Sequence, residues 1–244
     1  MTEQSAHANM NAKDAYDSVP PEDKKRAFCL LAAAGATFAL LLLSRLVWLF
    51  EPLLDLIYYG TLSEIIYYII LGALFTVYTV LLNRYLVKRT DEHIFLPKKE
   101  RLGFVRALGV IAVGTVAVFI AGAAFGFKLK IEVEMGRGVT MATALTNIAV
   151  YFYYAFHLWL GLTCAELVQR ALKILLPAKY TLPWGAIFLV AVFGVIELIL
   201  ELAATPHMFP WMYFLFTFAY AAIYVITDGS YHLTYWASVI IMVL

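Results

Sequence analysis

The sequence predicts an all-α polytopic integral membrane protein, a helical bundle with six complete spans and a partial seventh. Composition is the first reason, because 63% of the 244 residues are hydrophobic and only 14% are charged. A soluble domain is usually about a quarter charged, so this chain lacks the polar surface that a water-soluble globule needs. The second reason is the recurrence of apolar runs near the length of about 20 residues with which a helix crosses a bilayer.

The chain is expected to divide into a short tail and one membrane domain. Residues 1–26 are polar, end in basic side chains and are predicted to be a disordered cytoplasmic tail. Residues 27–244 are predicted to form a single transmembrane domain. The first apolar run begins near Ala27, after the polar leader, and is too long for the core of a removable signal peptide.

The spans follow from the apolar runs and their boundaries. Arg45 is an unexpected charge within the first span, and Pro177 should end the fourth helix, which can continue to Leu176. Residues 227–230, Thr-Asp-Gly-Ser, predict a turn before the last run, which is shorter than a crossing helix needs. The predicted spans are residues 27–50, 62–82, 107–127, 141–164, 183–204 and 211–226, with the partial span at 231–244.

Lysine and arginine are distributed unevenly between the two predicted sides. With the N-terminus inside, the outer segments hold only Lys128, Lys130 and Arg137, and the connection 83–106 is the most basic part of the chain. Cytoplasmic connections of membrane proteins carry the excess of basic residues, so the N-terminus should be cytoplasmic. We expect the protein to lie in the bacterial plasma membrane, with the lipid bilayer as its first partner.

Composition and spacing give no indication of several other functions. The net charge of +1 does not suggest nucleic acid binding. Cys29 and Cys164 lie in apolar runs without metal-ligand spacing and are expected to pack as small core residues. No two histidines stand three or four residues apart, so no helical metal pair is expected, and no cofactor is predicted.

Glu166 and Arg170 form the first candidate site. They are four residues apart, so they face the same side of a helix and can pair. Ionisable groups at or within a membrane span are costly to bury and suggest a functional site. Two interpretations stay open. Glu166 could activate water near the membrane, or the two residues could form a structural ion pair where the helix leaves the bilayer.

Phe193, Glu197 and Glu201 form the second candidate site. Their spacing of four residues places them on one helical face within the fifth span. Two carboxylates inside a membrane are unlikely to be ionised together, because desolvation and like charge both favour the protonated form. They could share a proton or activate water. Alternatively, they could be neutral acids hydrogen-bonded to a neighbouring helix, or one of them could pair with Arg45.

The order of these features resembles the CPBP family, which comprises CAAX prenyl endopeptidases and bacteriocin-processing membrane proteins. The resemblance covers residues 141–244. The stretch from Ala165 to Arg170 is similar to the family's EExxxR motif with alanine for the first glutamate, and Phe193–Glu197 is similar to FxxxH with glutamate for histidine. The third motif's histidine would fall near Ser238 and its asparagine near Met242, so neither is kept.

The resemblance implies an intramembrane glutamate-protease homologue whose motifs are degenerate. Glu166, Arg170 and Glu197 are the catalytic candidates, and Phe193, Glu201 and Ser238 are candidate binding residues. Without histidine and asparagine, the oxyanion stabilisation that acyl transfer needs is reduced. A non-enzymatic subunit that binds a membrane-embedded peptide or partner protein is the first alternative, and a proton-coupled transporter or permease subunit that uses Glu197 and Glu201 is the second.

Overall fold

The computed structural model describes residues 16–46, 61–95, 102–125, 141–176, 182–204 and 211–243. All regular structure in these ranges is helical, which confirms the all-α prediction. The helices are α3 (Pro21–Leu46), α5 (Thr61–Thr90), α6 (Phe104–Phe125), α8 (Met141–Leu175), α9 (Trp184–Phe188), the π-helix η4 (Leu189–Gly194), α10 (Val195–Ala204), α11 (Trp211–Ile226) and α12 (Tyr231–Val243).

Several of these helices have the length and composition of membrane spans. Within the described residues, the stretches long and apolar enough to cross a bilayer are Pro21–Ser44, Ile65–Thr90, Phe104–Ala123 and Ala144–Leu175. Trp184–Gly194 and Phe214–Ile226 are shorter apolar helices. The prediction of a helical membrane protein is therefore confirmed by helix length and apolar composition.

Two helices extend further than the apolar runs predicted. α3 begins at Pro21, so residues 21–26, which are part of the predicted tail, are helical. Proline suits the first helical turn, and Glu22 and Asp23 there interact favourably with the helix dipole. α5 continues to Thr90, past the predicted end of the span at residue 82, because basic side chains in its last turn complement the dipole in the same way.

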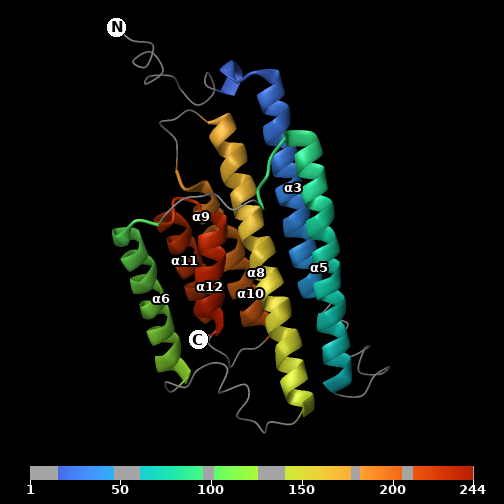
Figure 1. The fold of residues 1–244 in the computed structure, drawn as a ribbon, viewed down its shortest axis with the longest axis vertical. Coiled ribbons are helices and arrows are strands. Elements are labelled where there is room, and N and C mark those ends of the chain that lie inside the picture. Colours follow the sequence, from blue (N-terminus) through green and yellow to red (C-terminus); the bar gives the residue numbers. More distant parts are fainter. Residues whose placement is uncertain are drawn as a thin grey trace.

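α8 is the central helix of the bundle (Figure 1). α3 and α5 pack against each other and along α8, while α9, η4 and α12 also contact α8. α6 lies at the edge of the molecule, against α11 and α12 (Figure 1). With 35 residues, α8 is about 52 Å long, which exceeds the hydrocarbon thickness of a bilayer of about 30 Å.

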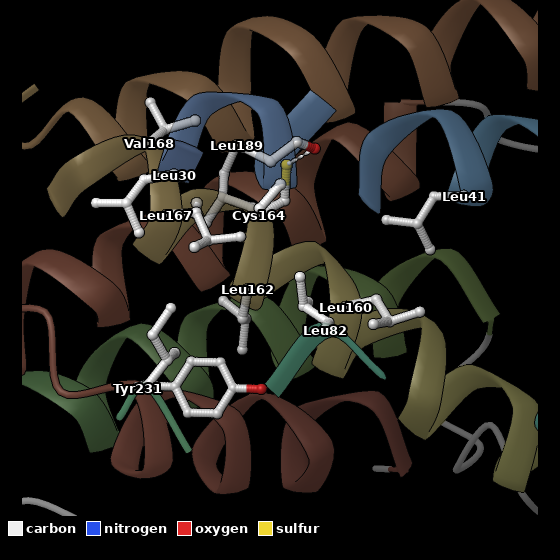
Figure 2. Close-up of a cluster of buried hydrophobic side chains, with 14 of the residues drawn as sticks. Leu30, Leu41, Leu82, Leu160, Leu162, Cys164, Leu167, Val168, Leu189 and Tyr231 are labelled. Atoms are coloured by element: carbon white, nitrogen blue, oxygen red, sulfur yellow. Dashed lines mark hydrogen bonds between the residues drawn. The ribbon is translucent and has the colours of Figure 1, made fainter. Parts of the chain in front are cut away.

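The core forms where α3 and α5 meet α8. Leu160, Leu162 and Leu167 of α8 are buried beside leucines of the two neighbouring helices, such as Leu30 and Leu82 (Figure 2). Cys164 lies among them, and its thiol donates a hydrogen bond to the carbonyl of Ala34 at 3.2 Å. Both cysteines are free, and Cys164 packs in the core as predicted.

The predicted fifth span is helical from Trp184 to Ala204 but changes its winding in the middle. The turn Leu189–Gly194 is a π-helix, which inserts extra residues and rotates the helical face that follows. Gly194 ends this turn beside α11, where an added Cβ would stand 3.1 Å from Phe214 Cδ2. The stretch from Phe193 to Glu201 therefore begins within the π-turn, whereas the prediction of a shared helical face assumed a regular α-helix.

The turn between α11 and α12 agrees with its sequence. Asp228 and Gly229 have φ angles of 58° and 72°, in the left-handed region that glycine and aspartate tolerate. The amide of Gly229 donates to the carbonyl of Tyr224 at 2.8 Å and closes the end of α11. The predicted connection 128–140, residues 51–60 of the predicted connection 51–61, and residues 1–15 of the tail lie outside the described residues.

Candidate functional site

The predicted pair of Glu166 and Arg170 is present near the C-terminal end of α8. Arg170 Nε donates to Glu166 Oε1 at 2.7 Å. The side chain of Glu166 is 5% exposed and that of Arg170 is 20% exposed. This is a largely buried ion pair, in which each charge depends on the other for compensation.

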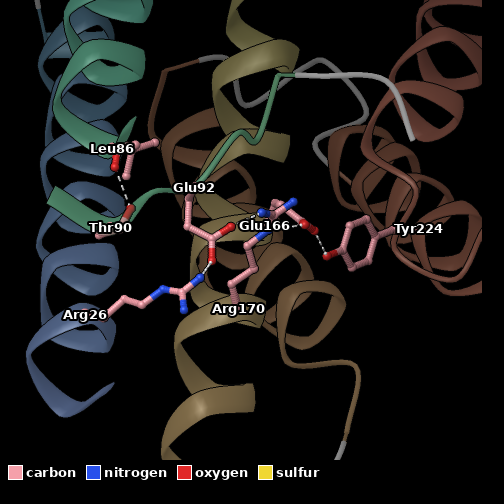
Figure 3. A network of polar contacts seen from close by, with 7 residues as sticks. All are labelled: Arg26, Leu86, Thr90, Glu92, Glu166, Arg170 and Tyr224. Atoms are coloured by element: carbon pink, nitrogen blue, oxygen red, sulfur yellow. Dashed lines mark hydrogen bonds and ion pairs between the residues drawn. The ribbon is translucent and has the colours of Figure 1, made fainter. Parts of the chain in front are cut away.

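Tyr224 engages the second oxygen of the same carboxylate. Its hydroxyl, from the last turn of α11, donates to Glu166 Oε2 at 2.5 Å (Figure 3). Both carboxylate oxygens of Glu166 are therefore hydrogen-bonded within the protein. Tyr224 could not be identified from the sequence, because it lies in an aromatic run typical of a membrane helix and its partner is 58 residues away.

Glu92 extends this network towards the surface. It follows α5 in a short non-helical segment, residues 91–95, which we call the strap. One oxygen of Glu92 pairs with Arg26 Nη2 and the other with Arg170 Nη1 (Figure 3). Burial opposes the charge of Glu92, but the attraction and hydrogen bonds of the two arginines exceed that effect and lower its pKa.

The rest of the strap is packed into the bundle. Ile94 is buried, and the ring of Phe95 stacks on Trp159 with centroids 5.6 Å apart. The carbonyl of Phe95 lies 3.0 Å from His232 Nε2 on α12. These contacts bring non-helical backbone between α8 and α12, and such backbone is tolerated in a membrane protein where other protein segments surround it. Sequence reasoning treated Glu92 as one residue of a basic connection and missed it.

Gln169 fixes the start of the fifth helical segment beside this network. Its amide nitrogen donates to the carbonyl of Leu182 at 3.2 Å, and its oxygen accepts from the amide of Gly185 at 2.8 Å. The backbones approach closely here, because a Cβ on Gly185 would stand 2.7 Å from the carbonyl oxygen of Ala165. Gln169 is thus a positioning residue, and the glycine permits the contact.

The remaining predicted residues lie elsewhere or outside the described side chains. Phe193 is buried, with its ring edge-on to Phe38 at 5.3 Å and 4.0 Å from the Cβ position of Gly161. The segment from α9 through η4 therefore runs back along α8, away from the level of Glu166. The side chains of Glu197, Glu201 and Arg45 lie outside the described residues, so a joint site of Glu166 and Glu197 stays a prediction.

Ser238 is fully buried on α12, and its hydroxyl has no hydrogen-bond partner among the described residues. It takes no part in the network around Glu166. Two other hydroxyls of the same helix, those of Tyr231 and Thr234, bond to Thr163 and Thr227 at 2.9 and 2.8 Å. These bonds join α12 to α8 and to the turn that follows α11.

The network has balanced charge, and its inner end at Glu166 has little contact with water, whereas Arg26 at its outer end is partly exposed. It holds two arginines and two glutamates, with a tyrosine hydroxyl at its inner end. Among the described residues, no group of three histidine, cysteine, aspartate or glutamate side chains is placed to hold a metal ion. Comparison with known proteins finds no matching family, no matching curated protein and no matching solved structure.

Proposed function

We propose that this protein is a non-catalytic membrane protein of CPBP-like organisation, which binds a membrane-embedded peptide or partner helix without cleaving it. The observation that carries the proposal is the state of Glu166. Arg170 and Tyr224 engage its two oxygens, so the carboxylate faces protein donors where a general base would face water.

The residues available for transition-state stabilisation support the same proposal. Hydrolysis of a peptide needs donors aimed at the developing oxyanion, usually the largest single catalytic contribution. By the resemblance, the family's histidine and asparagine would fall near Ser238 and Met242, and a thioether cannot donate a hydrogen bond. The transporter alternative depends on Glu197 and Glu201, whose side chains lie outside the described residues, so it stays open.

We also infer the orientation and the number of spans. Arg26, Lys88 and Arg170 lie near the same end of the bundle, where α3 begins and α5 and α8 end (Figure 1). This concentration supports a cytoplasmic N-terminus under the positive-inside rule. Our proposal is six complete spans and a partial seventh in a bacterial plasma membrane, in which the segment Trp184–Ala204 and α11 cross and α12 enters.

The test is to incubate the purified full chain with a library of transmembrane and prenylated peptides. We expect binding of one peptide class and no cleavage. Glu166→Gln is the matched variant, because it keeps the side-chain shape and one acceptor oxygen for Tyr224 or Arg170. Cleavage by the natural protein that is lost in Glu166→Gln would overturn the proposal and assign a protease.

A further inference from the structure

Two arginines from distant parts of the chain converge on a single carboxylate. Arg26 is near the start of α3 and Arg170 is near the end of α8, and each pairs with a different oxygen of Glu92. Arginine is the side chain best suited to bind carboxylate and phosphate oxygens, because its planar fork offers several fixed donors. The arrangement is that of an anion site whose present occupant belongs to the chain itself.

The carboxylate does not satisfy the fork of Arg26. Only Nη2 of this guanidinium reaches Glu92, while Nε is buried and has no acceptor among the described residues. A buried donor without an acceptor costs free energy. A tetrahedral phosphate, which offers more oxygens than a carboxylate, could bond to both nitrogens of the fork and still reach Arg170.

The charge of the site matches a singly charged anion. Without Glu92, the remaining Arg26, Arg170 and Glu166 hold two positive charges and one negative charge, which is a net charge of +1. A phosphodiester or monoanionic phosphate would therefore restore the neutrality that Glu92 provides now. The lowered pKa of Glu92 indicates that it is itself an anion at neutral pH.

The site is open to an outside ligand, and Glu92, which occupies it, belongs to the non-helical strap. The side chain of Arg26 is 41% exposed. Glu92 is the second residue of the strap, and Asp91 before it has a φ angle of 55°, in the left-handed region that aspartate tolerates. Because Glu92 lies outside α3 and α8, its side chain can leave the arginines without unfolding of either helix.

The surroundings place the site where phosphate groups are abundant. Lys25 lies beside Arg26 and is exposed, and Lys88 and Arg89 occupy the last turn of α5 before the strap. Basic clusters at the end of a membrane span attract anionic headgroups of the cytoplasmic leaflet. Arg26 stands near the start of the apolar helix Pro21–Ser44, so under the proposed orientation it lies close to the headgroup level.

We propose that Arg26 and Arg170 form a binding site for a phosphate-type monoanion, either an anionic lipid headgroup or free phosphate, which Glu92 occupies as an internal ligand in this structure. Such a ligand displaces the Glu92 side chain from the two arginines. This inference goes beyond the proposed function, because it concerns the outer part of the network and holds whether or not Glu166 is catalytic.

The test measures ligand binding by the purified full chain in neutral detergent. Phosphatidylglycerol is titrated and its bound fraction is followed by native mass spectrometry, with phosphatidylcholine as the comparison lipid. Inorganic phosphate is titrated separately by calorimetry. Glu92→Gln removes the competing charge and should tighten the binding of phosphatidylglycerol about tenfold, the effect expected when a charged competitor is lost from an arginine site.

Matched variants separate the site from general electrostatics. Arg26→Gln and Lys25→Gln each remove one positive charge from neighbouring positions, but only Arg26 contacts Glu92. In the Glu92→Gln background, Arg26→Gln should weaken binding about tenfold or more and Lys25→Gln only slightly. If Glu92→Gln does not yield folded protein by size exclusion, Arg26→Gln and Lys25→Gln are compared in the chain that keeps Glu92.

The outcomes divide clearly. Binding of phosphatidylglycerol alone identifies a lipid headgroup, and binding of inorganic phosphate as well shows that the phosphate group suffices; both support the proposal. Equal weakening by Arg26→Gln and Lys25→Gln, or binding that Glu92→Gln leaves unchanged, would overturn it. Peptide cleavage would not affect this result, so failure of the proposed function and failure of this inference can be distinguished.

Discussion

Arg170 pairs with two carboxylates, so its removal should leave the charges of both less compensated. Arg170→Ala removes the partner of Glu166 and one of the two partners of Glu92. A largely buried charge that loses its partner destabilises a protein by about 3–5 kcal/mol. We therefore expect much less folded protein by fluorescence-detected size exclusion. Adding Glu166→Gln to this variant should restore part of the folded protein. The added substitution removes the charge that has lost its partner, and Arg26 still compensates Glu92.

Arg106→Ala is the matched control for this prediction. Arg106 pairs with Asp228 at 3.4 Å, but both side chains are mostly exposed, at 54% and 72%. Exposed pairs contribute about 1 kcal/mol or less, so this variant should accumulate normally. Similar accumulation of Arg170→Ala and Arg106→Ala would mean that the network around Glu166 is not a stabilising feature.

Tyr224 tests the inner end of the network. Tyr224→Phe keeps the ring but leaves Glu166 Oε2 without its donor, and a buried acceptor left unsatisfied costs about 1–3 kcal/mol. The melting temperature in detergent should fall accordingly. Tyr220→Phe, one turn earlier on α11, removes a hydroxyl for which the described residues show no hydrogen bond and should change it little. Equal effects of the two substitutions would contradict the assigned role of Tyr224.

At the level of elements, the contact of α9 with α8 depends on a glycine. An alanine Cβ at Gly185 would stand 2.7 Å from the carbonyl oxygen of Ala165, and backbone cannot rotate away as a side chain can. Gly185→Ala should therefore push α9 outward, stretch its bond to Gln169 and destabilise the protein by about 1–3 kcal/mol. The measurement is the melting temperature of each variant in the same detergent.

Gly35→Ala in α3 is the matched control, because this substitution is not expected to destabilise the protein. Nothing lies within 4 Å of its Cβ position, so alanine has room there and favours the helix by up to about 1 kcal/mol. A loss of stability at Gly185 together with no loss at Gly35 would locate the effect in the helix contact. Equal behaviour at both positions would show that the close approach of α9 and α8 is unimportant.

The sequence predicted those parts of the fold and site that arise from local pattern. The apolar runs predicted the long helices, and the four-residue spacing predicted the pair of Glu166 and Arg170. The π-turn at Leu189–Gly194 has no comparable sequence signal. Glu92 and Tyr224 could not be placed, because their contacts with α8 join residues 78 and 58 positions apart and depend on how the helices pack.

At the level of the whole molecule, the described network of charged residues lies at one end of the bundle. α8 carries Glu166 and Arg170 near its C-terminal end, and the strap reaches them from α5 (Figure 3). The lower part of α8 packs instead through apolar and aromatic side chains such as Tyr153 and Leu160. The end that holds the network therefore determines which compartment its ligands come from.

That compartment can be tested by labelling single cysteines with a membrane-impermeant maleimide, in a chain whose Cys29 and Cys164 are replaced by alanine. Lys88 is exposed in the last turn of α5, whereas Thr90 is buried and bonded to the carbonyl of Leu86, so Lys88→Cys is the suitable reporter. Lys130→Cys is its counterpart in the connection predicted to lie outside.

The uneven distribution of basic residues predicts a cytoplasmic position for Lys88. We expect Lys130→Cys to react in intact cells and Lys88→Cys to react only after permeabilisation. The reverse pattern would place the arginine site and the N-terminus outside the cytoplasm.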